Sequence, residues 1–228
     1  MKIIVIGDIH GHDSWKRIID QEKTYDLLIF LGDYFDSFSK SSLTQYENYL
    51  DIAIFRDSSS NIITLLGNHE FHYLYPTRFS GWNANTQIIA EEVLQKDLKN
   101  KKLKFAYQYK NILFSHAGIT KTWLNEVMKI SLDGVLNNEI PLAYLDFQDQ
   151  GVYNMYGDSI NNGPLWVRPR SLQKDSLDDY IQVVGHTHMK GKITINEDKL
   201  YFCDSLPNEY LVIENDEFII KELNNELN

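Results

Sequence analysis

Five short apolar runs in the sequence each end in a group of polar residues, and this recurrence limits the fold more than any other feature. The runs occupy residues 2–6, 27–31, 62–66, 112–115 and 181–184. Short runs without polar alternation are typical of strands that are buried on both faces. Helical patterns lie between them at 14–23, 43–55 and 86–99. Alternating strands and helices of this kind predict an α/β fold around a largely parallel sheet.

The remaining parts of the chain have different patterns. Residues 192–223 contain short alternating strands separated by turns, which predicts antiparallel sheet. Residues 131–164 repeat Gly, Asn and Asp without periodicity, so we expect an irregular segment near the rim of a functional site. No repeat or linker divides the chain, and a single domain over residues 1–228 is expected.

Charge and cysteine content narrow the partners and the location. The chain has 22 Lys and Arg against 32 Asp and Glu, a net charge of −10, which disfavours an extended nucleic-acid partner but not a small phosphate ligand. Cys203 is the only cysteine, so a reducing compartment is expected. No apolar run approaches the roughly 20 residues of a membrane helix. We therefore expect a cytoplasmic protein without a membrane partner; the sequence leaves its oligomeric state open.

The polar groups that follow the five strands share the chemistry of metal ligands. They read Gly-Asp-Ile-His-Gly at 7–11, Gly-Asp-Tyr-Phe-Asp at 32–36, Gly-Asn-His-Glu at 67–70, Ser-His-Ala-Gly at 115–118 and Gly-His-Thr-His at 185–188. Five of the seven histidines fall in these groups, and the glycines allow the backbone to turn sharply. Strand carboxyl ends meet at one crevice of an α/β sheet. Carboxylates, an amide and imidazoles suit Mn, Fe or Zn better than Ca. Their number predicts two ions that share a carboxylate.

In this order and spacing, the five groups resemble the motif series of the calcineurin-like metallophosphoesterases. Gly-Asn-His-Glu and the segment Pro-Leu-Trp-Val-Arg at 164–168 resemble in particular the phosphoprotein-phosphatase (serine/threonine) branch and its small bacterial and phage members. The resemblance implies an α/β four-layer sandwich, in which two mixed β-sheets are flanked by helices. It also implies hydrolysis of a phosphate ester by direct attack of water held between two divalent ions, with Mn expected and Fe or Zn as alternatives.

The same resemblance assigns roles to individual residues. The expected metal ligands are Asp8, His10, Asp33, Asn68, His116, His186 and His188. Asp8 and His10 would bind the first ion, and Asp33 would bridge the two. His188 has two open roles, because the second His of this motif binds the first ion in nuclease-like branches but is not a ligand in many protein phosphatases.

Three further residues would act on the substrate. His69 would be the general acid that protonates the leaving oxygen, and Asp36 would orient it. Arg168 would hold the phosphate oxygens through its planar guanidinium. The phosphatase branch usually continues Gly-Asp-x-x-Asp with Arg, but Ser37 stands there in this chain. A rim residue would have to replace that guanidinium, and the candidates are Lys40, Arg78 and Arg170.

Several other residues have simpler interpretations. His12 and His72 are expected at the surface or behind the site, and Glu70 is expected to anchor the loop after the third strand. Trp166 is interpreted as a packing residue and Cys203 as buried and inert.

Three functions remain open at this stage. The first is a metal-dependent phosphomonoesterase, of the serine/threonine protein-phosphatase type or of broad specificity, acting on a phosphoprotein or a small phosphate ester. The missing arginine and the Gly-His-Thr-His pair favour a phosphodiesterase or a dinucleoside-polyphosphate pyrophosphohydrolase instead. The third is a binding protein that uses the same fold as a non-catalytic platform.

Overall fold

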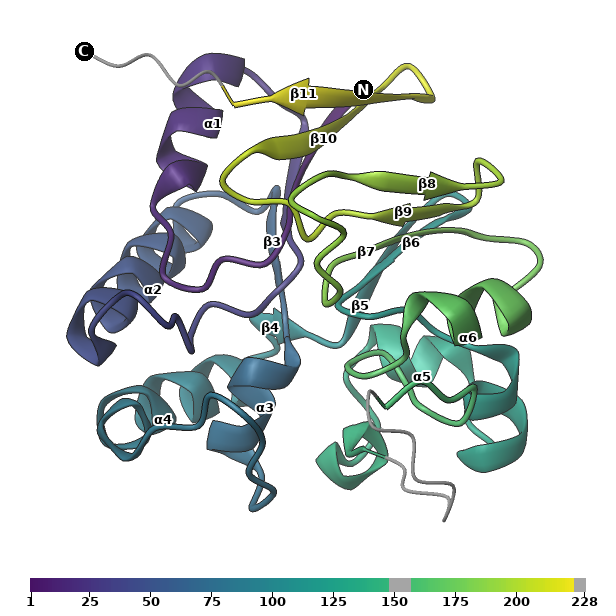
Figure 1. Ribbon diagram of the computed structural model, residues 1–228, viewed down its shortest axis with the longest axis horizontal. Coiled ribbons are helices and arrows are strands. Elements are labelled where there is room, and N and C mark those ends of the chain that lie inside the picture. Colours follow the sequence, from purple (N-terminus) through teal and green to yellow (C-terminus); the bar gives the residue numbers. More distant parts are fainter. Residues whose placement is uncertain (148–156, 224–228) are drawn as a thin grey trace.

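Two mixed sheets form the centre of the protein in a computed structural model that describes residues 1–147 and 157–223 (Figure 1). The six-stranded sheet contains, in spatial order, β11 (Glu217–Glu222), β10 (Glu209–Glu214), β1 (Lys2–Ile6), β2 (Leu27–Phe30), β3 (Ile62–Leu65) and β4 (Leu103–Lys104). The five-stranded sheet contains β5 (Ala106–Tyr109), β6 (Ile112–Ser115), β7 (Ile181–Val184), β9 (Leu200–Phe202) and β8 (Thr194–Asn196).

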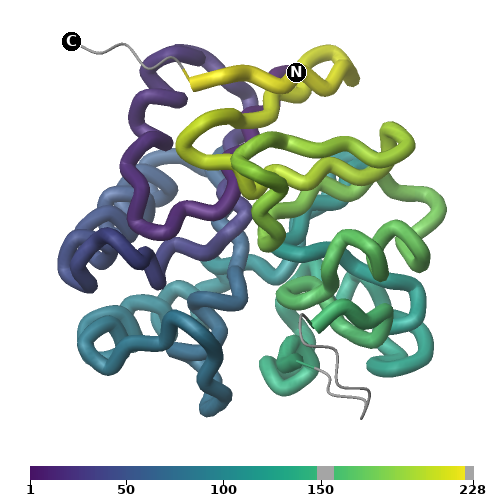
Figure 2. The backbone as a smooth tube through the Cα atoms, in the orientation of Figure 1, coloured from purple at the N-terminus to yellow at the C-terminus, as the bar shows by residue number. Residues whose placement is uncertain are grey.

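Helices cover the outer faces of the two sheets. The α-helices are α1 (Ser14–Glu22), α2 (Ser42–Asp57), α3 (Asn68–Leu74), α4 (Ala84–Lys99), α5 (Leu132–Leu136) and α6 (Pro169–Asp175), with a π-helical turn at Trp123–Val127 and a 3₁₀ turn at Leu142–Leu145. Figure 1 shows α1, α2 and α4 on one side of the molecule and α5 and α6 on the other. The tube in Figure 2 shows the same separation between the purple and blue segments and the green ones.

Alternate residues of the central strands face two different cores, which explains their continuous apolar sequence. In β1, Ile4 and Ile6 pack with Trp15 of α1 and the other helices, whereas Ile3 and Val5 pack between the two sheets. All four β1 side chains are essentially fully buried. Burying each contributes about 1.5–3 kcal/mol relative to exposure. A third cluster lies on the outer face of the second sheet, beneath α6. The layers are helix, sheet, sheet and helix, so the predicted α/β four-layer sandwich is confirmed.

Strand direction brings the carboxyl ends of the central strands together. β1, β2 and β3 pair in parallel in the first sheet, and β6, β7 and β9 pair in parallel in the second. Residues 192–223 form antiparallel pairs, as predicted, but the pairs lie in different sheets. The β8–β9 pair joins the second sheet and the β10–β11 pair joins the first. β9 also pairs in parallel with β7. β9 therefore ends at the same edge as β6 and β7.

The segment predicted to be irregular contains two short helical elements. Ser131 caps α5 by accepting a hydrogen bond from the N–H of Gly134, and the 3₁₀ turn follows. The part at 148–156 lies outside the described residues, while Phe147 and Gly157 on either side of it line a cleft. Within the described ranges, none of the helices combines the length and apolar character needed to cross a membrane.

Candidate metal centre and active site

The loops after the strands approach each other so closely that two positions require glycine. A Cβ atom on Gly67 would lie 2.2 Å from Asp33 Oδ1, and one on Gly185 would lie 2.0 Å from Asp8 Oδ1. Neither glycine adopts a positive φ. A sharp turn was the expected reason for glycine at these two positions. The structure instead shows that glycine is needed because two of the loops after the strands pack closely against each other.

Four residues of the site adopt the left-handed backbone conformation that favours glycine. These are His10 at φ 40°, Asp33 at 52°, Asp36 at 65° and His186 at 62°. The conformation costs roughly 1–2 kcal/mol for each such residue. Surrounding interactions must therefore hold these loops in place.

Glu70 supplies much of that support. Its fully buried carboxylate accepts hydrogen bonds from the backbone N–H groups of Asp33 at 2.9 Å, Tyr34 at 2.7 Å and Phe35 at 3.3 Å. It also accepts from the N–H of Gly67 at 3.0 Å. Glu70 thus anchors the loop after β2 as well as the predicted loop after β3, and couples the two.

One group of ligand atoms lies between Asp33, Asn68, His116 and His186. His116 Nδ1 is 2.9 Å from the Leu31 carbonyl, which only accepts, so Nδ1 carries the proton that it donates. Nε2 of the same ring is then left 2.8 Å from Asn68 Oδ1 and 3.3 Å from Asp33 Oδ2. His186 Nδ1 also lies 2.8 Å from Asn68 Oδ1.

Asn68 Oδ1, Asp33 Oδ2 and His116 Nε2 face one another, and a cation among them would stabilise this arrangement. Burial lowers the pKa of His116, but the Asp33 carboxylate outweighs burial and raises it to about 9. A divalent ion would compete with a proton for Nε2. A histidine that donates its other N–H to a carbonyl is typical of metal ligands. The donor set therefore fits a metal ion.

A second group contains His10 and the same carboxylate of Asp33, and Asp8 interacts electrostatically with that carboxylate. His10 Nδ1 donates to the Phe35 carbonyl at 2.7 Å, and its Nε2 lies 3.8 Å from Asp33 Oδ2. The backbone N–H of His186 is 3.0 Å from each oxygen of Asp8. Burial raises the pKa of Asp8. Burial acts in the same direction on Asp33, but the His116 and His69 imidazoles hold the pKa of Asp33 well below its usual range. Asp33 is the carboxylate that both groups share.

His188 lies outside these two groups. Its side chain is 60% exposed, and its Nδ1 is 3.8 Å from Asp204 Oδ1. Asp204 itself was missed by the sequence analysis, although it follows the apolar strand β9 as Asp8 follows β1. Burial raises the pKa of Asp204, and its carboxyl interacts electrostatically with His10 and His188. It adds a carboxylate beside the group that contains Asp8 and His10.

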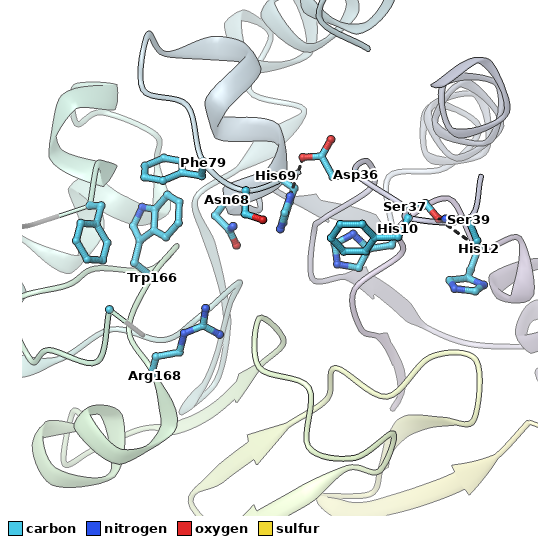
Figure 3. Close-up of a pocket in the computed structure, with 14 residues that line it drawn as sticks. His10, His12, Asp36, Ser37, Ser39, Asn68, His69, Phe79, Trp166 and Arg168 are labelled. Carbon is cyan, nitrogen blue, oxygen red and sulfur yellow. Dashed lines mark hydrogen bonds and ion pairs between the residues drawn. The ribbon is translucent and has the colours of Figure 1, made fainter. Parts of the chain in front are cut away.

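His69 and Asp36 form a pair at the cleft (Figure 3). His69 Nδ1 lies 2.7 Å from Asp36 Oδ2, and the hydroxyl of Tyr73 donates to the other oxygen of Asp36. Burial lowers the pKa of His69, but Asp33 and Asp36 outweigh burial and raise it to about 9. The His69 side chain keeps 18% of its surface exposed. It is therefore oriented by Asp36 and accessible from the cleft.

The cleft has a volume of about 760 Å³ and runs between His10 and His12 on one side and Trp166 and Phe79 on the other (Figure 3). Trp166 is 7% exposed and its Nε1 donates to the Leu145 carbonyl at 2.9 Å, so it packs as predicted and also lines the cleft.

Arg168 projects into the same cleft beside Asn68 (Figure 3). Its Nη1 donates to the His186 carbonyl at 3.0 Å and to Thr187 Oγ1 at 3.1 Å. Burial lowers its pKa, although an arginine remains charged at any physiological pH.

The structure does not bring any of the three expected replacements for the missing arginine into the lining of the cleft. Neither Lys40, Arg78 nor Arg170 lines the cleft, and Arg78 instead stacks 3.8 Å from the ring of Trp82. Within the part of the chain that the structure describes, Arg168 is the one basic lysine or arginine lining the cleft.

Two residues with simpler interpretations are buried. Cys203 is buried as expected, and burial raises the pKa of its thiol. His72 lies behind the site, against Asp36. His12, in contrast, is on the rim of the cleft.

Residues 1–212 match the model of the family described as calcineurin-like phosphoesterase. The chain belongs to this family. It is accordingly a metal-dependent phosphoric ester hydrolase, and the structure contains His and Asp clusters that could hold metal ions.

Solved structures share the fold at low sequence identity. A cold-active protein-tyrosine phosphatase from a psychrophilic Shewanella is 19% identical with a TM-score of 0.66, over 97% of this chain and 78% of that one. A Saccharomyces cerevisiae protein serine/threonine phosphatase is 16% identical with a TM-score of 0.58, over 97% and 79%. A metallophosphoesterase from Sphaerobacter thermophilus is 15% identical with a TM-score of 0.54, over 97% and 88%. Comparison with curated protein sequences gives no significant match.

Proposed function

We propose that this phosphoesterase hydrolyses phosphate monoesters, as a serine/threonine-type protein phosphatase or a phosphatase of broad specificity. The carrying observation is the His69–Asp36 pair, with 2.7 Å between Nδ1 and Oδ2, at the cleft that both ligand groups adjoin. An alkoxide leaving group requires a proton in the transition state, because it is a strong base. His69 is oriented to donate that proton from Nε2, since Nδ1 is occupied by Asp36.

The metal centre of the proposal contains two divalent ions, with Mn as the expected metal. Asp8 and His10 would hold one ion. The other ion would be held by Asn68, His116 and His186. Asp33 would be a ligand of both ions. When bound, the ions would activate the attacking water and neutralise charge on the phosphoryl oxygens. His188 would contribute to the first ion only if its exposed ring turned inward.

Arg168 binds the phosphate oxygens in this proposal. Its Nη1 is held by the His186 carbonyl and by Thr187, which fixes the plane of the guanidinium before substrate arrives. A preoriented donor costs no reorganisation when charge develops in the transition state. Water attacks in line, Arg168 binds the non-bridging oxygens, and His69 gives its proton to the leaving oxygen.

One observation favours a second candidate, hydrolysis of a phosphodiester or a dinucleoside polyphosphate. Arg168 is the single guanidinium among the described residues that line the cleft. A diester phosphate carries one negative charge, whereas a monoester carries nearly two at neutral pH. A site with one guanidinium therefore discriminates less strongly in favour of the monoester.

A paired assay separates the candidates. The Mn-loaded protein is assayed with a nitrophenyl phosphate monoester and with the bis-nitrophenyl diester, and then with phosphoserine and phosphotyrosine peptides of one sequence. Higher kcat/KM for the monoester and turnover of the peptides support the proposal. Preference for the diester supports the second candidate. Binding of two ions without turnover of any ester supports the platform hypothesis.

The proposed substrate is a phosphorylated protein side chain or a small phosphate ester. The acidic net charge of −10 disfavours a nucleic-acid polymer. The single, buried Cys203 agrees with a cytoplasmic location. The proposal treats residues 1–228 as one catalytic domain, because both sheets contribute to the metal centre.

A further inference from the structure

His72 is a buried histidine that the proposed reaction does not use. Its side chain is completely buried, and its Nε2 lies 2.6 Å from Asp36 Oδ2. The contact is short but poorly aligned, and neither ring nitrogen has a well-aligned hydrogen bond within the described residues. Burying an imidazole without full hydrogen bonding is costly. A position of this kind therefore needs a reason beyond packing.

The helix α3 explains why His72 reaches the same carboxylate as His69. The two residues are three positions apart, so their side chains lie on the same face of the helix. Their ring centroids are 5.6 Å apart and the rings are nearly perpendicular, at 84°. His69 Nδ1 and His72 Nε2 approach the same oxygen of Asp36, at 2.7 and 2.6 Å.

Asp36 also contacts Tyr73 and the backbone near Gly81. The Tyr73 hydroxyl donates to Oδ1. A Cβ on Gly81 would be 3.0 Å from Asp36 Cβ and 3.2 Å from Oδ2, so that backbone packs directly on the carboxylate. Asp36 itself has the left-handed φ of 65°. Its side chain thus projects from a strained loop and is fixed by its neighbours on α3.

We propose that His72 and Tyr73 are positioning residues, which hold the Asp36 carboxylate so that Asp36 keeps the His69 ring aimed at the leaving oxygen. Two contacts on Oδ2 and one on Oδ1 restrict rotation of the carboxylate. Among the described residues, His69 Nδ1 is oriented by that carboxylate, and the other ring nitrogen points into the cleft (Figure 3). The inference rests on the proposed function, because it concerns delivery of a proton to a leaving group.

The effect should depend on the leaving group. General acid catalysis typically contributes about 10²–10⁴-fold, and it matters most for strongly basic leaving groups. His72→Leu keeps the volume but removes the contact with Asp36. We expect it to lower kcat/KM for a phosphoserine peptide by about tenfold or more. Nitrophenolate needs little protonation, so nitrophenyl phosphate should lose less than about threefold.

The experiment compares both substrates in the Mn-loaded wild type and in four variants: His72→Leu, His72→Gln, Tyr73→Phe and Tyr49→Phe. The glutamine amide can donate to Asp36 from a position close to that of Nε2, so His72→Gln should recover most of the activity towards the phosphoserine peptide. Tyr49→Phe is the matched control. Tyr49 is also a buried tyrosine that donates to an aspartate, Asp97 at 2.7 Å, but it does not line the cleft. Metal content and thermal unfolding are measured for each variant.

The proposal requires that His72→Leu and Tyr73→Phe change the ratio of the two kcat/KM values while Tyr49→Phe does not. It is overturned if His72→Leu slows both substrates equally, or if His72→Gln is no better than His72→Leu. If His72→Leu does not fold, His72→Gln and Tyr73→Phe decide the matter through the same ratio. Absence of turnover by the wild type would overturn the proposed function and this inference together. Wild-type turnover with an unchanged ratio would overturn the inference alone.

Discussion

Replacement of Asp33 by asparagine should uncouple the two halves of the metal centre. Asp33 Oδ2 lies 3.3 Å from His116 Nε2, 3.8 Å from His10 Nε2 and 4.0 Å from His69 Nε2. Oδ1 accepts from the backbone N–H of His69 at 3.0 Å. Asparagine has the same shape and keeps the second interaction through its own oxygen. The variant therefore removes the charge with little change in packing.

The size of the effect follows from the distances. Two unit charges about 4 Å apart interact by roughly 4 kcal/mol at the effective dielectric constant of a protein site, and a divalent ion doubles this figure. Solvent recovers part of the loss. Even half of the single-charge value for each of two ions corresponds to about 10³ in combined affinity. We expect Asp33→Asn to retain at most one tightly bound ion and to lose at least about 10³-fold in turnover.

Metal content after equilibrium dialysis against Mn, and hydrolysis of nitrophenyl phosphate, test this prediction. Asp97→Asn is the matched control, because Asp97 is also a buried carboxylate but pairs with Arg56 at 2.9 Å, away from the cleft. The control should lose stability but keep two ions per chain and its turnover per folded molecule. Two tightly bound ions in Asp33→Asn, with turnover within tenfold of the wild type, would refute the bridging role.

The remaining predictions concern residues that support the site or stabilise the fold. Glu70→Gln should cost about 1–3 kcal/mol in chemical unfolding for each loop N–H that it leaves unpaired; an unchanged midpoint would contradict this. Gly185→Ala should displace Asp8 and lower metal content, since its Cβ would lie 2.0 Å from Oδ1; an unaltered Mn stoichiometry would show that the loops can move apart. Asp204→Asn should weaken Mn binding at the group that contains Asp8 and His10, and a titration with Mn that matches the wild type would exclude its role. Glu22 is buried, which opposes ionisation, but two lysines and a tyrosine hold its pKa below its ordinary value of 4.5. It therefore stabilises the fold fully above that pH and loses this effect as pH falls through the lower folded value. Urea unfolding of Glu22→Gln should accordingly differ from the wild type near pH 7 and converge with it below pH 4.5; a constant difference would contradict the assignment.

The sequence predicts the central strands well because their burial on both faces makes their residues apolar without interruption. The edge strands are different. β4 has two residues, and β5 is largely half-buried, so neither has an apolar run that marks it. Their pairing depends on neighbours that are distant in sequence. The helix α3 was also missed, because its first turn is the polar Asn-His-Glu of the metal-ligand loop.

The candidate metal ligands could be placed because each follows a strand that the sequence identifies. Asp204 was missed for the converse reason. Residues 200–202 were expected in antiparallel sheet, and only the parallel pairing of β9 with β7 shows that its carboxyl end meets the site. His72 carries no sequence signal either, since its role depends on the position of Asp36, 36 residues earlier in the chain. The sequence likewise could not show that Lys40, Arg78 and Arg170 do not line the cleft, because that depends on how the rim loops fold.

The strained backbone and the facing acceptor atoms of the site have a common consequence. Left-handed conformations at His10, Asp33 and His186 aim their side chains into one small space, where Asp33 and Asn68 also present oxygen atoms. The hydrogen bonds from the loops after β2 and β3 to Glu70 hold this arrangement. With a divalent ion, the same atoms would become ligands, which requires the bound imidazole nitrogens to be unprotonated. Metal binding and folding are therefore linked through the same residues. The loops around Glu70 provide the rigidity that lets the ligands be positioned before the ion arrives, and the hydrolytic function that the family implies depends on that arrangement.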